Sequence, residues 1–405
     1  MSMKNKIVFN NITNIINKND KQLLQYRSCP ICKNDDSKTI LKIDNFQFFS
    51  DSKQAKQVDI NQKQCKSCGA IYLNPCYSNE GFGILFAEAG QSYGSSEGRP
   101  NEQVNWLNKY NLLEDGSTVL DVGCGTGDFL ASLPNNLSKL GVDIDAPSVN
   151  IAKNKYQDIK FICSSFENLE YNDKIDTITM YHVLEHLPNP LETLQRLYTL
   201  SDKTTKLVVE VPIIENGHTN DINGFFSVQH LTHFSCSSLK NILSLSGWNI
   251  LEWLEQEDYN GCRVLLQKQN ILDNIIFNNT EYLNAYQYLS SWYKSVENVE
   301  KKLCQLDTNK CIIWGGGMHL EFLYQMTSLF TKDIEYIIVD SDKNKQNKTW
   351  RGISIYNPEI LKNIDKNIPL IISSYGGQDS IKNAALRLGI NKTNIITLYD
   401  NLRIY

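Results

Sequence analysis

The sequence has 405 residues, which is long for a single hydrophobic core and favours two or three domains. Hydrophobic residues make up 41% and charged residues 21%, as expected of a folded, soluble chain. The net charge of −5 argues against a nucleic-acid partner held by general attraction to phosphate. No apolar run is long enough to cross a bilayer, and the N-terminus lacks a secretory signal, so we expect a cytoplasmic protein without membrane contact.

The first chemical signal along the chain is a pair of C-x2-C motifs. Cys29 and Cys32 form the first motif, Cys65 and Cys68 form the second, and 32 residues separate them. Four thiolates satisfy the tetrahedral preference of Zn²⁺, and a reducing compartment disfavours disulfides. The spacing therefore predicts a structural zinc site in an N-terminal domain of residues 1–78. The alternative is redox-active or free cysteines, although nothing around them resembles a thioredoxin unit.

Strands and helices alternate through the middle of the chain. We expect buried strands at residues 119–122, 139–143, 176–180 and 206–211, with helical patterns such as 190–200 between them. This alternation predicts a parallel sheet with helices on both faces. It defines a second domain of residues 79–268.

A glycine-rich motif follows the first of these strands, in the run Val119-Leu-Asp-Val-Gly-Cys-Gly-Thr-Gly-Asp. The strand delivers Asp121 to its carboxyl end, and Gly123, Gly125 and Gly127 let the turn approach a ligand closely. Such a turn can also bind a dinucleotide pyrophosphate. A carboxylate two residues before the first glycine would repel a pyrophosphate, whereas it suits the ammonium group of an amino-acid ligand.

Two further turns come in the order that an adenosine-containing ligand requires. The second strand ends at Asp143 and Ile144, where an acid accepts hydrogen bonds from ribose hydroxyls. The third turn carries Ser165 and Phe166, which suit the edge and the face of adenine. Together the three turns predict an S-adenosylmethionine-dependent methyltransferase. The alternative is a nucleotide-binding fold without catalysis.

The C-terminal region, residues 269–405, repeats the strand–glycine–helix pattern after a long amphipathic connector at 280–306. Strands are expected at 311–314, 335–340 and 369–374, and Gly315, Gly316 and Gly317 follow the first of them. We therefore expect a small Rossmann-like α/β domain. The glycines suit a nucleotide or nucleotide sugar, but they are equally typical of a tight strand–helix turn without a ligand.

The middle region resembles the class I methyltransferases, in the run His182-Val-Leu-Glu-His-Leu-Pro-Asn-Pro and the run His230-Leu-Thr-His-Phe-Ser. The whole chain resembles the zinc-containing sugar C-methyltransferases, which act on nucleotide-linked ketosugars for antibiotics and surface polysaccharides. That resemblance nominates Tyr93 in a loop over the cofactor, His186 in the active site and His230 as the general base. Gln229 and Ser227 stand where the family has a Glu and a Tyr, which favours transfer to a hydroxyl over transfer to carbon.

Other interpretations remain open at this point. Structural roles are expected for His182 and His233, and a metal site at the histidines is conceivable, although no third ligand is evident nearby. The leading function is methylation of a nucleotide-activated sugar or a related precursor, on carbon or oxygen. The alternatives are a methyltransferase for another small metabolite and a non-catalytic scaffold that binds the cofactor.

Overall fold

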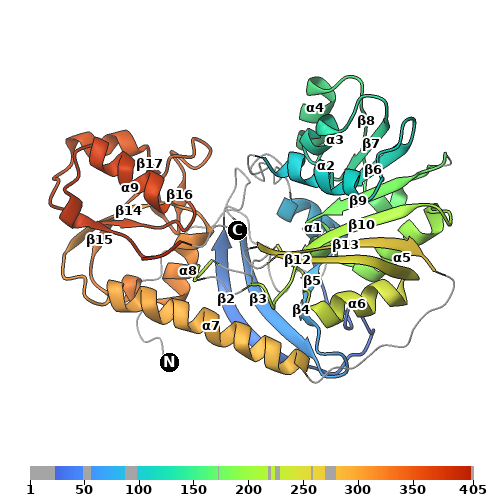
Figure 1. Cartoon of the computed structure of the whole chain (residues 1–405). Coiled ribbons are helices and arrows are strands. Elements are labelled where there is room, and N and C mark those ends of the chain that lie inside the picture. The colour runs from blue at the N-terminus through green and yellow to red at the C-terminus, as the bar shows by residue number, and fades with distance from the viewer. Residues whose placement is uncertain are drawn as a thin grey trace.

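The computed structural model describes residues 23–48, 56–86, 98–171, 173–217, 220–223, 229–256, 259–269 and 280–402. These residues form a four-stranded, a seven-stranded and a six-stranded sheet and a small two-stranded one. In Figure 1 the six-stranded and seven-stranded sheets lie on opposite sides of the four-stranded sheet, and a long helix runs below.

An antiparallel sheet follows the N-terminus. Its strands are, in sheet order, β11 (Thr232–His233), β4 (Ile71–Leu73), β3 (Lys56–Cys65) and β2 (Ser37–Phe48). Beside it lie β1 (Leu24–Gln25), its partner β5 (Cys76–Tyr77) and helix α1 (Asn79–Phe86). β11 comes from far along the chain and pairs with β4. The N-terminal sheet is therefore completed by a segment that lies outside the N-terminal region of the sequence.

The seven-stranded sheet has the order β12-β13-β10-β9-β6-β7-β8. Its strands are β6 (Thr118–Val122), β7 (Ser138–Asp143), β8 (Lys160–Cys163), β9 (Thr177–Tyr181), β10 (Lys206–Pro212), β12 (Trp248–Gln256) and β13 (Tyr259–Lys268). The first five are parallel, which confirms the predicted α/β fold, and β12 and β13 add an antiparallel hairpin at one edge. The strand order reverses at β6, where ligands of open α/β sheets bind.

Alternate residues of the strands face different layers. Val119 packs in a core with α2 (Arg99–Lys109), α3 (Asp128–Ser132) and α4 (Ala146–Lys155). Leu120 packs in the opposite core, with α5 (Pro190–Leu200) and α6 (Cys236–Leu245). This period of two explains why the strand sequences are apolar throughout, since both faces are covered.

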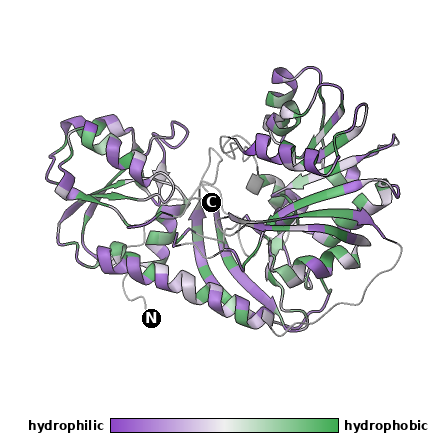
Figure 2. Ribbon diagram, in the orientation of Figure 1, coloured by the Kyte–Doolittle hydropathy of each residue, from purple (hydrophilic) through white to green (hydrophobic). Residues whose placement is uncertain are grey.

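Helix α7 (Thr280–Leu303) begins where the connector was predicted and ends three residues earlier than expected. Its buried residues recur at helical spacing and include Ala285, Tyr288, Trp292 and Val296. Figure 2 shows the mixed hydropathy of this helix beside the largely apolar strands. The indole of Trp292 donates to the carbonyl of Ile222 at 2.9 Å, so α7 also contacts the segment that follows β10.

The C-terminal sheet has the order β16-β17-β15-β14-β18-β19, and all its pairings are parallel except that of β16 with β17. Its strands are β14 (Lys310–Trp314), β15 (Glu335–Val339), β16 (Thr349–Trp350), β17 (Ile353–Tyr356), β18 (Leu370–Ile372) and β19 (Ile395–Ile396). Its helices are α8 (Met318–Met326), α9 (Gln378–Arg387) and the 3-10 segments Leu329–Thr331, Pro358–Asn363 and Lys392–Asn394.

A buried ion pair fastens this sheet to the N-terminal one. Glu321 on α8 is fully buried and accepts hydrogen bonds from Arg351, at 2.9 Å from Nε and 2.5 Å from Nη2. The same guanidinium donates to the carbonyl of Asn45, in β2, at 2.6 Å. One side chain therefore links the two sheets.

We expect Arg351→Met to lower the free energy of unfolding by about 3–5 kcal/mol, because it leaves the Glu321 carboxylate buried without its partner. Urea denaturation followed by the fluorescence of the buried neighbour Trp350 measures this loss. The double variant Arg351→Met/Glu321→Leu should recover most of it. A single variant as stable as the parent would contradict the assignment.

Candidate functional site

The glycine-rich turn lies between β6 and α3, at the carboxyl end of the parallel strands. The amides of Gly123 and Cys124 both donate to the carbonyl of Val142, at 2.8 and 3.2 Å, which holds the turn against β7. Gly125 has a φ of 51°, and a Cβ there would meet no atom within 4 Å. The left-handed φ favours glycine at this position, and the space beside it is open to a ligand. Gly127, also left-handed, begins α3.

Asp143 ends β7 and faces this turn. Its Oδ2 accepts from the amide of Gly125 and its Oδ1 from that of Asp145, both at 2.8 Å. Burial raises the pKa of Asp143, and these two amides work in the opposite direction. Next to it Ile144 is 41% exposed. A fixed carboxylate beside an exposed apolar side chain suits a ribose and the ring attached to it.

Asp121 is 4% exposed and accepts a hydrogen bond from Thr179 Oγ1 at 2.7 Å. Burial raises the pKa of this carboxyl to about 7, against the opposing effect of the Thr179 bond. Ionisation of Asp121 at neutral pH is therefore unfavourable unless a cation lies next to the carboxylate.

The third predicted turn lies on the same edge of the sheet. Ser165 precedes the 3-10 segment Phe166–Asn168, and Phe166 is 6% exposed within the core.

A charged network at the ends of β9 and β10 was not predicted. Glu210 is 1% exposed and bonds to Arg263 Nε at 2.5 Å, to His182 Nε2 at 3.0 Å and to Tyr259 at 2.7 Å. Although burial opposes its charge, His182, Arg263 and Arg99 hold the pKa of Glu210 below its usual range. An acid inside the apolar run Leu207-Val-Val-Glu-Val was the signal that could have revealed it.

His182 itself has a φ of 55°, a conformation that residues other than glycine rarely adopt. Burial favours its neutral ring, but the nearby carboxylates of Glu185 and Glu210 raise its pKa. The expected structural role of His233 stays a prediction. His233 lies in β11 and is 1% exposed, and burial lowers its pKa to about 3, so its ring is neutral.

The two histidines predicted to be catalytic, His186 and His230, lie next to each other although they are far apart in the sequence. The rings of His186 and His230 have centroids 4.8 Å apart, and His186 Nδ1 lies 2.9 Å from the carbonyl oxygen of Gln229. The carboxylate of Glu185, 1% exposed, is 3.8 Å from His186 Nε2. Tyr93, the third predicted catalytic residue, lies outside the described residues, as does Ser227.

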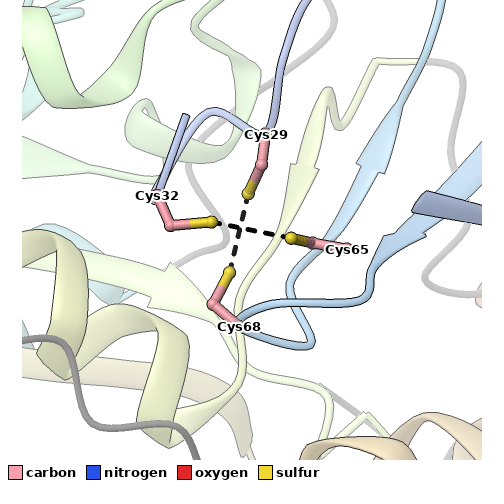
Figure 3. A group of neighbouring side chains, drawn as sticks. All are labelled: Cys29, Cys32, Cys65 and Cys68. Atoms are coloured by element: carbon pink, nitrogen blue, oxygen red, sulfur yellow. Dashed lines mark hydrogen bonds between the residues drawn. The ribbon is translucent and has the colours of Figure 1, made fainter. Parts of the chain in front are cut away.

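The four predicted zinc ligands converge on one point (Figure 3). The Sγ atoms of Cys29 and Cys68 are 3.6 Å apart, and so are those of Cys32 and Cys65. Four sulfurs around Zn²⁺ at about 2.3 Å form a tetrahedron with edges of about 3.8 Å, so the cluster has the size that the ion requires. In each motif an amide bonds back to the first cysteine's carbonyl, Lys33 to Cys29 and Gly69 to Cys65.

Arg27 connects the cysteine cluster's domain to the histidines. Its Nη1 donates to the carbonyl of Pro188 and its Nη2 to that of Leu231, the latter at 2.6 Å. The amide of Leu231 in turn donates to the carbonyl of Glu185 at 2.8 Å. The loops that carry His186 and His230 are thus held by Arg27 of the N-terminal region as well as by each other.

Among the described residues, no helix combines the length and the apolar character needed to span a bilayer.

Comparisons with known proteins assign the central region. The family model of a methyltransferase domain matches residues 99–252, and a model named C2185-like, N-terminal, matches residues 307–396. Methyltransferase 235L of Invertebrate iridescent virus 6 is 25% identical over 138 residues, 32% of this chain and 52% of that protein. The tRNA U34 carboxymethyltransferase of Sulfurimonas denitrificans is 30% identical over 175 residues, 40% of this chain and 59% of that protein.

The chain thus spans about half the length of the curated relatives it matches. A solved S-adenosylmethionine-dependent methyltransferase from Clostridium acetobutylicum covers 47% of this chain and 99% of its own, at 13% identity and a TM-score of 0.37. The sheet order and the family match agree, whereas the contacts predicted between the three turns and a cofactor stay predictions. Residues 99–252 therefore form a class I S-adenosylmethionine-dependent methyltransferase domain.

Proposed function

We propose that the enzyme methylates a nucleotide-activated sugar, with its C-terminal Rossmann-like domain binding the nucleotide. The observation that carries this proposal is a repeated hydrogen-bond pattern. In the C-terminal sheet, Asp340 Oδ2 accepts from the amide of Gly316 at 2.7 Å, and Oδ1 accepts from that of Asp342 at 2.8 Å. Asp143 makes the equivalent pair of bonds in the methyltransferase domain. The same arrangement in both domains supports a second ribose-binding acid.

The surroundings of Asp340 suit a phosphorylated ligand. Lys345 Nζ lies 3.8 Å from Asp340 Oδ2, and a Cβ built on Gly317 would lie 3.3 Å from that ammonium. Helix α8 begins directly after Gly317. A lysine over a glycine turn at a helix N-terminus is the chemistry that proteins use for phosphate groups.

The C-terminal domain also contacts the segment that follows β10. Asn220 donates to the carbonyl of Asn401 at 2.7 Å, and the amide of Ile222 donates to the hydroxyl of Tyr399 at 3.3 Å. That hydroxyl is 2.6 Å from His319 Nε2 on α8. A segment that leaves the methyltransferase sheet at its ligand-binding edge is therefore packed on the nucleotide domain, which supports one substrate contacting both.

In this proposal S-adenosylmethionine supplies the methyl group, and Asp121 and Asp143 hold its ammonium and ribose. The acceptor lies beside His186 and His230, where an imidazole removes its proton. Gln229 adds no carboxylate to assist enolate formation, so a hydroxyl is the favoured acceptor. The four cysteines hold a structural Zn²⁺.

We expect Asp340→Asn to weaken binding of uridine and thymidine diphosphate sugars by about 10-fold or more, because a charge-assisted hydrogen bond to ribose is lost. Calorimetry measures the dissociation constant of the nucleotide sugar. The control is Asp379→Asn, which changes an exposed acid of the same domain. S-adenosylmethionine affinity should not change in either variant.

Turnover with radiolabelled cofactor then tests the substrate class. Methyl transfer to a nucleotide sugar, lost in Asp340→Asn, supports the proposal. Because one relative is named as a tRNA enzyme, tRNA belongs in the same panel. Labelling of tRNA but of no nucleotide sugar would overturn the proposed substrate and leave the methyltransferase assignment intact.

A further inference from the structure

Glu185, His186 and His230 form a cluster that the methyltransferase fold does not account for. One ligand atom from each lies within 4.8 Å of the other two. Glu185 and His186 belong to the 3-10 segment Leu184–His186, and His230 immediately precedes Leu231, whose amide bonds to the Glu185 carbonyl. Backbone hydrogen bonding therefore fixes the two loops against each other before any ligand is present.

The carboxylate of Glu185 lacks the hydrogen bonds that a buried acid normally receives. The side chain is 1% exposed, and neither Oε1 nor Oε2 has a hydrogen-bond partner among the described residues. The nearest ring nitrogens are His182 Nδ1 at 3.4 Å and His186 Nε2 at 3.8 Å. His182 is also shared with Glu210 and Tyr259 through its other nitrogen. A buried carboxylate in this state calls for a further positive charge.

The tautomer of His186 is set by its backbone contact. Because a carbonyl only accepts, the 2.9 Å contact between Nδ1 and the oxygen of Gln229 makes Nδ1 the protonated nitrogen. The lone pair then lies on Nε2, the nitrogen nearer to Glu185. A ligating histidine whose second nitrogen donates to a backbone carbonyl is the usual arrangement in metal sites.

We propose that Glu185, His186 and His230 bind a divalent transition-metal ion. Two imidazoles and one carboxylate suit Mn²⁺, Fe²⁺, Co²⁺ or Zn²⁺, and three protein ligands leave coordination positions open. Donors at about 2.1 Å from one ion lie at most about 4.2 Å apart, and the 3.8 Å between Glu185 Oε1 and His186 Nε2 is within that limit.

The site is close to the cofactor turn. Val183, two residues before Glu185, packs on Gly123 so closely that a Cβ on that glycine would lie 2.3 Å from Val183 Cγ2. This inference rests on the proposed function and replaces one step of it. With His186 and His230 as ligands, an acceptor hydroxyl bound to the ion would have a lowered pKa and would pass its proton to a water molecule in place of an imidazole.

The test is titration of Mn²⁺ into the full, zinc-containing chain, with free Mn²⁺ counted by electron paramagnetic resonance. Mn²⁺ prefers oxygen and nitrogen donors, so the four thiolates do not compete for it. We expect one bound Mn²⁺ per chain. Glu185→Gln and His230→Gln should each weaken its binding by at least about tenfold. Glu192→Gln, an exposed acid on α5, should bind it like the parent.

S-adenosylmethionine affinity, measured on every variant, shows that the methyltransferase fold is kept, and a variant that fails this check is replaced by His186→Gln. Absence of Mn²⁺ binding by the parent, or unchanged binding in the ligand variants, overturns the site. No acceptor is present in these titrations, so an incorrect substrate assignment does not affect their outcome.

Discussion

Asp121→Asn is expected to lower the affinity for S-adenosylmethionine by about 10–100-fold and, at pH 8, to raise the thermal stability of the cofactor-free protein. The first effect follows because the ligand's ammonium loses a charge-assisted hydrogen bond. The second follows because Asn removes a carboxylate whose ionisation is opposed by burial, while its side-chain oxygen can still accept from Thr179.

The pH dependence has a definite sign. The pKa of Asp121 rises from 3.8 to about 7 on folding, so the folded chain retains a proton that the unfolded chain releases. Stability of the cofactor-free protein should therefore fall as the pH rises from about 4 to 7 and level off above. Cofactor affinity should rise over the same interval, because the ammonium requires the ionised carboxylate.

Calorimetry at pH 5.5 and pH 8, in buffers of different ionisation enthalpy, measures the affinity and the protons released. Asp158→Asn, an exposed acid near the end of α4, is the matched control and should change neither quantity. Equal affinity in Asp121→Asn and parent, or binding without proton release at pH 5.5, would contradict this role for Asp121.

Local pattern was sufficient to predict four of the five parallel strands of the central sheet, whereas β8, with only four residues, was not predicted. Residues such as Val119 and Leu120 face two different cores, so the strands are apolar throughout and stand out from the flanking helices. The antiparallel pairing of β12 with β13 was not predicted, because charged residues such as Glu252 in the edge strand β12 and the buried Arg263 in β13 interrupt the apolar pattern. The pairing of β11 with β4 was not predicted either, because β11 has only two residues and so shows no strand pattern in the sequence.

The candidate site, like the fold, could be predicted from the sequence only in part. Asp121 and Asp143 could be nominated as cofactor contacts because each lies near the carboxyl end of a recognisable strand. Asp143 accepts from Gly125 in the turn after the neighbouring strand, and the contact of either acid with the cofactor stays a prediction. The cluster of Glu185 with His186 and His230 could not, since the third ligand is supplied by a tertiary contact between Leu231 and Glu185. Glu185 itself was visible beside His186, but only its burial sets it apart from a solvated acid.

Removing the metal from the four cysteines is expected to have the largest effect on stability. Binding of structural Zn²⁺ amounts to about 10–16 kcal/mol in small zinc modules, where it is inseparable from folding. Cys29, Cys65 and Cys68 are almost fully buried and belong to the same hydrophobic core as Leu194 and Leu197 of α5. We therefore expect loss of the proposed ion to expose part of the methyltransferase core as well as the N-terminal sheet.

We expect one Zn²⁺ per chain by elemental analysis of protein purified without added metal. Cys65→Ser should lose the ion and unfold at a lower temperature than the parent. The control Cys304→Ser changes an exposed thiol just after α7 and should match the parent.

Chelation should also reduce methyl transfer, because Arg27 no longer holds the carbonyls of Pro188 and Leu231 beside the two histidines. A metal-free chain that melts at the parental temperature would show that the cysteines are ordinary thiols. A zinc-free chain that is destabilised but fully active would show that Arg27 does not depend on the ion for its position.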